Sequence, residues 1–293
     1  MELFDQTTME CSKLITQRYS TSFTLGIKTL DKKFHMPVYA IYGFVRYADE
    51  IVDTFHNYDK KSLLQNFKKE TYKAIEDGVS FNPVLNSFQL VVNQYKIDHS
   101  LIEAFLHSME LDLEETTYDQ TGYNEYIYGS AEVVGLMCLK VFCENNQTLY
   151  DSLVAPAKKL GAAFQKVNFI RDIKSDYEER GRVYFPGVDF NEFTKLTKDE
   201  IEADIQKDFD DALEGILSLP KGAKLGVYLA YRYYLKLFRK IKRLPASRIK
   251  QERIRIKDSM KMRILLMTYF QHRIVLNPTS LKKRINITSL KTI

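Results

Sequence analysis

Two pairs of aspartates interrupt stretches of the chain that are otherwise mainly apolar. The pairs are Asp49 with Asp53 and Asp172 with Asp176, and each follows a run of apolar residues with helical patterning. In a helix, the Asp-x-x-x-Asp spacing places two carboxylates one turn apart on one face. A helix that is apolar nearly all round is buried, so its acids must face a lined cavity or remain unpaired at high cost. The sequence therefore predicts helices packed around an internal polar site.

The chemistry of that site follows from the charge of the four aspartates. Converging carboxylates repel one another unless cations lie between them. Oxygen ligands suit Mg²⁺, which prefers a few carboxylates together with phosphate oxygens and water. The pairs therefore predict a site that holds a diphosphate through metal ions. The alternative is a solvated helix face, where aspartates at this spacing are common.

Helical periodicity dominates the rest of the chain. Only 12 Gly and 7 Pro occur in 293 residues, and alternating strand patterns are scarce. We expect one all-α domain over residues 1–293, because runs of helices with short connections form bundles. The expected helices cover residues 5–20, 34–56, 60–77, 83–96, 99–115, 121–144, 148–178, 197–217, 221–243 and 248–274, and a loop over 181–187 closes the helix of the second aspartate pair.

Composition limits the cellular context. No run of 18 or more apolar residues occurs, so no membrane span is expected. The first residues lack the basic and apolar regions of a secretion signal. Three cysteines at positions 11, 138 and 143 have no metal or redox spacing. We expect a cytoplasmic protein.

The net charge of +5 is concentrated near the C-terminus, where residues 239–263 hold eleven Lys or Arg against Glu252 and Asp258. No nucleic-acid motif accompanies this segment, so nucleic acid is not an expected partner. An anionic membrane surface or a diphosphate substrate fits the charge equally well, which leaves a membrane-peripheral location open. A solvated basic helix face is the remaining alternative.

Polar residues extend both aspartate pairs into stripes. The first stripe reads Tyr42, Arg46, Asp49, Asp53, and the second reads Gln165, Asn168, Asp172, Asp176. The Asn168 amide could bind a metal or a phosphate oxygen. Arg171 and Arg182 flank the second stripe, and arginine suits phosphate because it can donate two parallel hydrogen bonds. For each arginine the alternative is a salt bridge to an acid of the same site.

Aromatic residues are abundant, with 19 Tyr and 18 Phe. Many must fill the core, but a ring face near the polar stripes can stabilise a cation. Phe23, Tyr42 and Tyr128 are the candidates. Scattered histidines form no metal cluster, and no Gly-x-Gly-x-x-Gly or Walker-type loop indicates a nucleotide site.

These motifs resemble the squalene/phytoene synthase family of head-to-head prenyl synthases, and within it the bacterial phytoene synthases. The run Asn168 to Asp176, followed by Gly181-Arg182-Val-Tyr184-Phe-Pro186, is similar to the family signature N-x-x-R-D-x-x-x-D with its G-R-x-Y-x-P loop. The run Arg46 to Asp53 is similar to the first signature, with Glu50 in place of its second aspartate.

Two further segments carry the resemblance. Tyr19-Ser20-Thr-Ser22-Phe23 resembles the family's substrate flap, which implies that Ser20 and Ser22 contact substrate. Residues 126–135, which include Tyr128, resemble a central segment of the family that lines its hydrophobic channel. The chain departs from the pattern there, with Glu132 and Val133 in place of Gly and Thr.

The resemblance implies an isoprenoid synthase fold with a central cavity that binds two prenyl diphosphates, geranylgeranyl diphosphate by preference. It implies Mg²⁺ held by the four aspartates and Asn168, and it leaves open whether Mn²⁺ can replace Mg²⁺. The expected product is 15-cis-phytoene, formed through a cyclopropyl diphosphate in carotenoid biosynthesis. The proton acceptor could be the departing diphosphate or a tyrosine such as Tyr184 or Tyr233.

Two other functions are compatible with these motifs. A user of farnesyl diphosphate would make dehydrosqualene or squalene. Squalene formation ends with reduction by NADPH, and since no nucleotide motif is present, no NADPH is expected. A non-catalytic helical scaffold that binds lipid diphosphates is the remote alternative.

Overall fold

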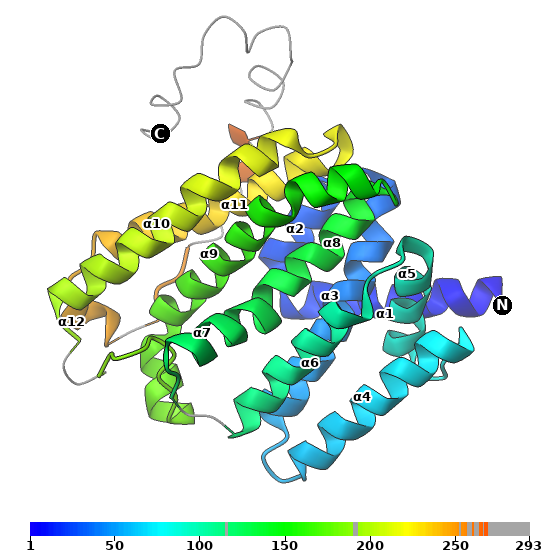
Figure 1. Cartoon of the computed structure of the whole chain (residues 1–293), viewed down its shortest axis with the longest axis horizontal. Coiled ribbons are helices and arrows are strands. Elements are labelled where there is room, and N and C mark those ends of the chain that lie inside the picture. The colour runs from blue at the N-terminus through cyan, green and yellow to red at the C-terminus, as the bar shows by residue number, and fades with distance from the viewer. Residues whose placement is uncertain are drawn as a thin grey trace, which may run out of the picture.

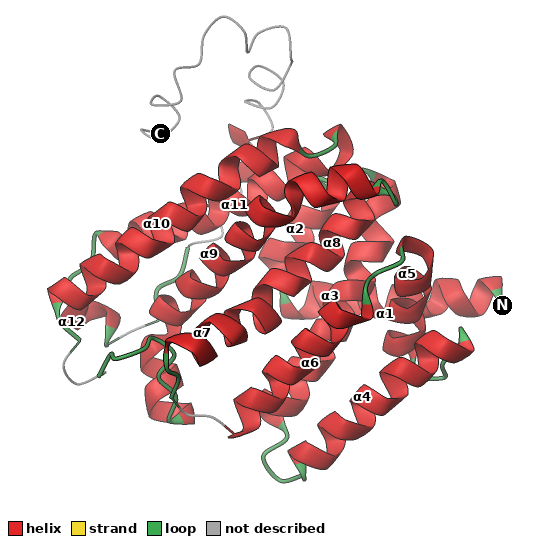
Figure 2. Cartoon of the chain, in the orientation of Figure 1, coloured by secondary structure: helices red, strands yellow, loops and turns green. Residues whose placement is uncertain are grey.

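The fold consists of packed helices (Figure 1). Two cavities lie among them. The computed structural model describes residues 1–114, 117–189, 193–251 and 253–256, together with residues 260, 264, 265, 267 and 268. Within these residues the regular structure is helical (Figure 2), and an isolated parallel bridge joins Thr117 to Val183. The predicted all-α class is confirmed, whereas the extent of a single domain over 1–293 stays a prediction.

The helices are α1 (Glu2–Tyr19), α2 (Thr21–Lys28), α3 (Lys32–Thr54), α4 (Lys60–Asp77), α5 (Pro83–Tyr95), α6 (His99–Glu114), α7 (Gln120–Ile127), the π-helical turn η1 (Tyr128–Glu132), α8 (Val133–Cys143), α9 (Gln147–Arg180), α10 (Lys195–Ser218), α11 (Lys221–Lys242) and α12 (Ala246–Ile249).

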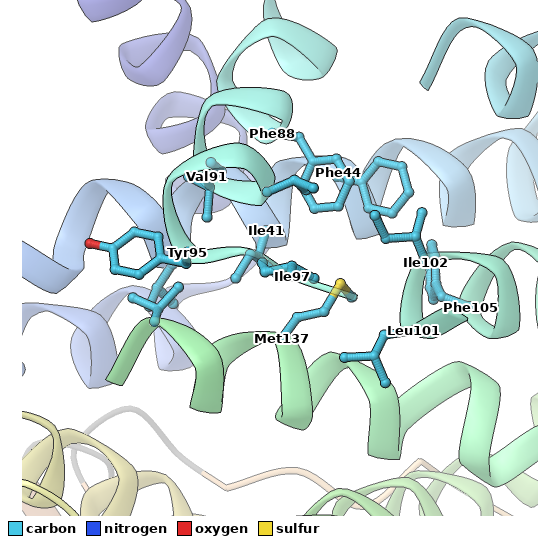
Figure 3. Packing of buried hydrophobic residues seen from close by; sticks show 14 of the residues in the cluster. Ile41, Phe44, Phe88, Val91, Tyr95, Ile97, Leu101, Ile102, Phe105 and Met137 are labelled. Carbon is cyan, nitrogen blue, oxygen red and sulfur yellow. The ribbon is translucent and has the colours of Figure 1, made fainter. Parts of the chain in front are cut away.

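The two aspartate-bearing helices, α3 and α9, both pack against α8 (Figure 1). On its other sides α3 contacts α1 and α5, and α9 contacts α10 and η1. The apolar stripe of α3 explains its position: Ile41, Phe44 and Val52 are each at most 2% exposed. Phe44 stacks on Phe88 of α5 with ring centroids 3.9 Å apart (Figure 3). This packing turns the opposite, polar stripe of α3 toward the interior cavities.

Helix α2 was not predicted. The chain breaks at Ser20, whose backbone is extended, and the Ser20 hydroxyl accepts a hydrogen bond from Phe23 N at 3.2 Å. This is an N-cap, which starts a new helix by satisfying a free backbone N–H. The serine and threonine run after Tyr19 was the available signal.

The expected helix over 121–144 is divided by the turn η1. Gly129 lies in this turn, and a Cβ there would be 2.4 Å from the carbonyl oxygen of Ala104 on α6. Glycine therefore permits the close approach of η1 to α6. The widened turn places Ser130 and Ala131 on a cavity wall, which agrees with the tendency of π-helical turns to occur at functional sites.

The expected helix over 248–274 is wrong at residues 250, 251 and 253–256. After α12 the chain turns and runs without helical structure through 253–256. Ile254 and Ile256 are buried, whereas Arg253 and Arg255 are exposed. This alternation has the period of two of an extended segment, and it buries both isoleucines in a way that a helix would not. Most of the expected helix beyond 256 lies outside the described residues.

One helical run in the described part of the chain, Gln120–Cys143, is long and apolar enough to cross a membrane by length and composition alone. Core helices of other proteins pass the same test, and 56% of its apolar window is buried inside the fold. The run packs against α6 and α9, so burial in the protein accounts for its apolar character.

Candidate active site

Two adjoining cavities lie between α3 and α9. One is polar, with a volume of about 820 Å³, and the other is mainly apolar, with a volume of about 460 Å³. The residues common to both linings are Val45, Ser130, Gln165, Asn168 and Arg171. The cavities therefore meet at a band of polar side chains, with a charged compartment on one side and a hydrocarbon-like compartment on the other.

The polar cavity is lined by both aspartate pairs, Asp49 and Asp53 from α3 and Asp172 and Asp176 from α9. The convergence expected from the sequence is thus present, although more than a hundred residues separate the pairs. A further carboxylate that the sequence analysis did not identify, Asp112 of α6, lines the same cavity.

Burial affects two acids of this cavity, Asp49 and Asp112. Burial raises the pKa of Asp49 to about 7, and Arg46 opposes the shift while Asp53 and Asp112 add to it. The Asp49 side chain keeps 34% of its surface exposed, and Asp49 lines the polar cavity. Burial likewise raises the pKa of Asp112 to about 6. Carboxylates that resist ionisation in this way are stabilised by a bound cation.

The donor set fits Mg²⁺ in chemical type, since it consists of carboxylate and amide oxygens. Within the described part of the chain, no three His, Cys, Asp or Glu residues lie close enough together to hold a metal by themselves. Mg²⁺ usually retains water and shares one or two carboxylates with substrate phosphates. The aspartates and Asn168 fit a metal of that shared kind rather than a cage made by the protein alone.

Arg46 lies at the α3 wall of the polar cavity. Its guanidinium pairs with Glu50 and lies 3.8 Å from Asp49, and it stacks over the ring of Tyr19 at 4.4 Å. The buried Arg46 Nε meets no acceptor among the described residues. A buried donor without an acceptor is costly, and a phosphate oxygen in the cavity would satisfy it.

Two arginines hold Asp172 on the α9 wall. Arg171 donates from Nε to Asp172 Oδ1 at 2.9 Å, and Arg253 donates to the same oxygen at 2.8 Å. Arg182 was expected beside the second aspartate pair, but its ion pair is with Asp112, at 3.2 Å. The alternative weighed for each arginine, a salt bridge within the site, therefore describes the contacts of both Arg171 and Arg182.

A chain of amides links the two cavities. Gln165 donates to the Ser130 hydroxyl at 3.2 Å, and Asn168 donates to Gln165 at 3.3 Å. Tyr234 of α11 donates to the Asn168 amide oxygen at 3.4 Å, and its ring stacks on Phe164 at 4.0 Å. These contacts fix the orientation of the second polar stripe.

The flap candidates line the apolar cavity. Ser20, Ser22 and Phe23 are in its wall with Tyr42, and the Phe23 and Tyr42 rings are 5.2 Å apart. Tyr128, which was predicted to contact substrate, lines neither cavity: its ring lies under the Lys158 ammonium at 4.7 Å. The turn η1 directs the residues after Tyr128, rather than Tyr128 itself, to the cavity.

Tyr184 lines the polar cavity and is 7% exposed. Its ring stacks on Phe169 with centroids 4.1 Å apart. Burial raises the pKa of the Tyr184 hydroxyl well above its usual value, with Asp112 adding to the shift. The hydroxyl therefore keeps its proton at neutral pH, which favours a different proton acceptor.

Several site residues escaped the sequence analysis, namely Asp112, Arg253, Arg255 and Tyr234. Asp112 had a detectable signal, because it follows the buried Phe105 and Met109 at i+7 and i+3 on one face of α6. For Arg253 and Arg255 the available signal was the alternation of arginine and isoleucine over residues 253–256. Tyr234 had no signal that separated it from the other tyrosines of α11.

The fold and the site define an all-α protein in which an acidic cavity opens into an apolar one. The chain belongs to the squalene/phytoene synthase family, whose sequence model matches residues 16–259. Members of this family are head-to-head prenyl synthases that act on prenyl diphosphates.

Named relatives agree with this assignment. The chain is 26% identical over 196 residues to a 4,4'-diapophytoene synthase of Staphylococcus haemolyticus, with 65% of this chain and 66% of the relative covered. It is 25% identical over 249 residues to the chloroplastic phytoene synthase 1 of Zea mays, with 78% and 60% covered. The matches thus span about three fifths to two thirds of these relatives.

Solved structures show the same fold. A dehydrosqualene synthase in complex with a ligand superposes with a TM-score of 0.78 at 23% identity, covering 92% of this chain and 98% of that one. A squalene synthase from Alicyclobacillus acidocaldarius gives a TM-score of 0.73 at 18% identity, covering 82% and 94%.

Proposed function

We propose that this protein condenses two molecules of geranylgeranyl diphosphate head to head and makes 15-cis-phytoene through a cyclopropyl diphosphate. The observation that carries the proposal is the junction of the two cavities at Gln165, Asn168 and Arg171. An amphiphilic diphosphate can place its head among the aspartates and arginines and its hydrocarbon tail in the apolar cavity.

The first step separates a diphosphate from its allylic carbon, and the basic groups of the polar cavity favour it. Arg46, Arg171 and Arg253 all line that cavity. Their guanidinium groups can donate to the departing phosphate oxygens and neutralise the developing charge. Bound Mg²⁺, held by the aspartates and Asn168, would supply Lewis-acid stabilisation of the same leaving group.

The allylic cation then alkylates the double bond of the second substrate, and the resulting carbocation loses a proton as the ring closes to the cyclopropyl diphosphate. A second ionisation, rearrangement and loss of a proton give phytoene. The rings of Phe23, Tyr42 and Tyr234 line the apolar cavity, where they can stabilise the cation. The apolar lining also excludes water, which would capture it. Because the buried Tyr184 keeps its proton, the departing diphosphate is the better acceptor of the product proton.

A second candidate substrate is farnesyl diphosphate, which would give dehydrosqualene or squalene. The likeness to a 4,4'-diapophytoene synthase and to the fold of a dehydrosqualene synthase favours it. Chain length depends on the side chains at the far end of the apolar cavity, so the two candidates differ in tail length and not in the chemistry of the polar cavity.

The test is incubation of the purified protein with Mg²⁺ and either geranylgeranyl or farnesyl diphosphate, followed by identification of the products by mass spectrometry. We expect phytoene from the first and little product from the second. Exclusive conversion of farnesyl diphosphate would replace the first candidate by the second. EDTA is expected to stop turnover, and restoration by Mg²⁺ or Mn²⁺ would identify the usable metals. Product formation without added NADPH checks the expectation that none is needed.

Matched variants test the site itself. Asp49→Ala and Asp172→Ala are each expected to slow diphosphate release at least about 100-fold, the range found when one charge-stabilising group is removed. Asp151→Ala, which alters an exposed residue of α9, is the control. Unchanged release in both site variants would favour the non-catalytic scaffold.

We also propose peripheral contact with anionic membranes, because substrate and product are hydrophobic and the last turn of α11 carries Arg239, Lys240 and Lys242. Arg253 contacts Asp172 instead, so this part of the basic segment serves the cavity. Flotation with anionic liposomes at low salt is the measurement, and absence of binding there would remove the proposal.

A further inference from the structure

The Asp112 carboxylate of the polar cavity is contacted by side chains from two other parts of the fold. Its Oδ2 accepts from the Tyr126 hydroxyl at 2.7 Å, and its Oδ1 accepts from the Tyr184 hydroxyl at 3.3 Å. Its Oδ1 lies 3.2 Å from Arg182 Nη1, and its backbone carbonyl accepts from Arg182 Nη2. Both carboxylate oxygens are thus already engaged.

The contacts of Asp112 join three parts of the fold. Asp112 lies in the last turn of α6, Tyr126 in α7, and Arg182 and Tyr184 in the loop after α9. The parallel bridge between Thr117 and Val183 ties the same loop to the segment that follows α6. The loop after α9 is therefore attached to the end of α6 by side chains and by backbone.

This loop is coupled directly to the second aspartate pair. Gly181 has φ +65° and ends α9, and its N–H donates to the Tyr177 carbonyl at 3.1 Å. Arg182 N–H donates to the Asp176 carbonyl at 2.8 Å. The Gly181 bond is that of an αL C-cap, and the Arg182 bond attaches the following residue to Asp176 near the end of the helix. Movement of Arg182 therefore displaces the turn that carries Asp176.

Arg182 is buried, so its positive charge needs the negative charge of Asp112 beside it. The Arg182 side chain is 10% exposed and that of Asp112 is 8% exposed. When one member of a buried ion pair is removed, the other charge remains uncompensated and strongly destabilises that arrangement. An Arg182 without Asp112 would move toward the remaining acids of the cavity, and the loop would move with it.

We propose that Asp112 is a positioning residue, which clamps the Gly181–Tyr184 loop against α6 and thereby holds Asp176 in the wall of the polar cavity. The proposal deepens the proposed function, because it rests on Asp176 acting in a metal–diphosphate site. It assigns Asp112 no contact with substrate, since its oxygens are engaged by Arg182, Tyr126 and Tyr184.

The test compares the wild type with Asp112→Asn, which keeps the shape of the side chain and removes its charge. Glu114→Gln is the matched control: it removes a carboxylate from the same helical turn, where Glu114 makes an exposed pair with Lys61 at 2.6 Å. Binding of Mg²⁺ with inorganic diphosphate is measured by calorimetry, and hydrogen exchange is measured on peptides that cover residues 176–188.

For Asp112→Asn we expect affinity for Mg²⁺ and inorganic diphosphate to fall about 10- to 100-fold, the range for residues that orient metal ligands. Hydrogen exchange should increase in residues 176–188 and stay unchanged in α1 and α5. In the prenyl assay the metal requirement should rise, while kcat largely recovers at saturating Mg²⁺. The Glu114→Gln protein should match the wild type in all three measurements.

A double variant shows whether the two residues act as one unit. If Asp112 acts through Arg182, adding Arg182→Gln to Asp112→Asn should cost little further diphosphate affinity, because coupled effects are not additive. Wild-type affinity and exchange in Asp112→Asn would overturn the proposal, as would exchange that increases equally in all helices.

The assays separate this inference from the proposed function. If the wild type binds Mg²⁺ and inorganic diphosphate but forms no prenyl product, the proposed function is contradicted. The binding and hydrogen-exchange measurements then still decide whether Asp112 is a positioning residue. A wild type that does not bind them would overturn the metal–diphosphate site and the positioning role together.

Discussion

Arg253 Nε lies 2.8 Å from Asp172 Oδ1, and this ion pair joins the segment after α12 to the helix of the second aspartate pair. Arg171 donates to the same carboxylate oxygen at 2.9 Å. The segment runs alongside α11, where Lys240 donates to the Arg255 carbonyl at 2.7 Å. The polar cavity thereby gains a basic wall beside Asp172, which suits a ligand that carries both diphosphate and metal ions.

Replacement of Arg253 tests this wall. Arg253→Gln is expected to raise the KM for the prenyl diphosphate about 10-fold, as expected when one hydrogen bond to a charged group is lost. Steady-state kinetics at saturating Mg²⁺ is the measurement. Lys69→Gln, which removes one positive charge from an exposed position of α4, is the control. Equal KM values in both variants would show that Arg253 pairs with Asp172 without contributing to diphosphate binding.

Phe142 is expected to limit the length of the substrate tail. It lines the apolar cavity, and along the helical run from residue 130 to residue 142 it lies about 18 Å beyond the junction of the cavities. Phe142→Ala should enlarge the far end and shift the ratio of kcat/KM values toward the longer prenyl diphosphate. Competition between the two diphosphates measures this ratio.

The control for Phe142 must separate selectivity from stability. Phe142→Ala should lower the free energy of unfolding by about 3 to 5 kcal/mol. Phe88→Ala removes an equally large ring that is 0% exposed and outside both cavity linings, so it should lower stability without changing the ratio. Similar ratios for both variants would locate the limit of tail length elsewhere.

The pKa of Asp49, raised to about 7 by burial, predicts a pH dependence of stability in the metal-free protein. Unfolding returns this carboxyl to a pKa near 4, so between about pH 4 and pH 7 the folded state binds more protons than the unfolded state. Asp49 therefore lowers the free energy of unfolding as the pH rises through this window. Below about pH 4, Asp49 does not affect the free energy of unfolding, and above about pH 7 its full destabilising effect is present.

Asp49→Asn should reduce that loss. In EDTA, chemical denaturation of this variant at pH 5 and pH 8 should show a smaller decrease in the free energy of unfolding than the wild type shows. Asp151→Asn, at an exposed position, should keep the wild-type difference. If Asp49→Asn showed the same decrease in the free energy of unfolding as the wild type, burial would not be holding the proton on Asp49.

A buried ion-pair cluster between α9 and α10 should support the wall that carries the second aspartate pair. Asp208 is 1% exposed and lies 2.6 Å from Lys166 and 2.9 Å from Lys159. Asp208→Ala leaves Lys166, itself 8% exposed, without one partner. We expect the free energy of unfolding to fall by about 3 kcal/mol, as in other broken buried pairs.

An exposed ion pair provides the comparison. Lys33 and Glu144 are 2.6 Å apart, with side chains 53% and 49% exposed. Lys33→Met should change the free energy of unfolding by less than about 1 kcal/mol, because exposed pairs contribute little. Urea denaturation of both variants checks the contrast, and equal effects would contradict the importance of burial at Asp208.

The helices and the acidic stripes were predictable because their signals are local. Asp49 and Asp53 share a face through the helical repeat, and their apolar neighbours require that helix to be buried. The same reasoning applies to the stripe on α9. The η1 turn depends instead on a close contact, Gly129 against Ala104, which changes the backbone without altering the surrounding apolar pattern.

The partners of the arginines could not be predicted in this way. Arg182 stands near the second aspartate pair in sequence, yet Asp112 of α6 binds it. Arg253 was expected in a helix, but burial of Ile254 and Ile256 favours an extended segment that brings Arg253 to Asp172. Both outcomes depend on which helices pack side by side.

Residue spacing was enough to predict an all-α protein with two acidic stripes on buried helices, because a periodicity of 3.6 residues links spacing to a shared face. The packing of the helices was needed to show that Asp112 joins the acids of the site, that Arg253 reaches it, and that Tyr128 does not. Contacts between distant residues arise when helices pack to bury apolar surface, and the positions of the charged groups follow from that packing.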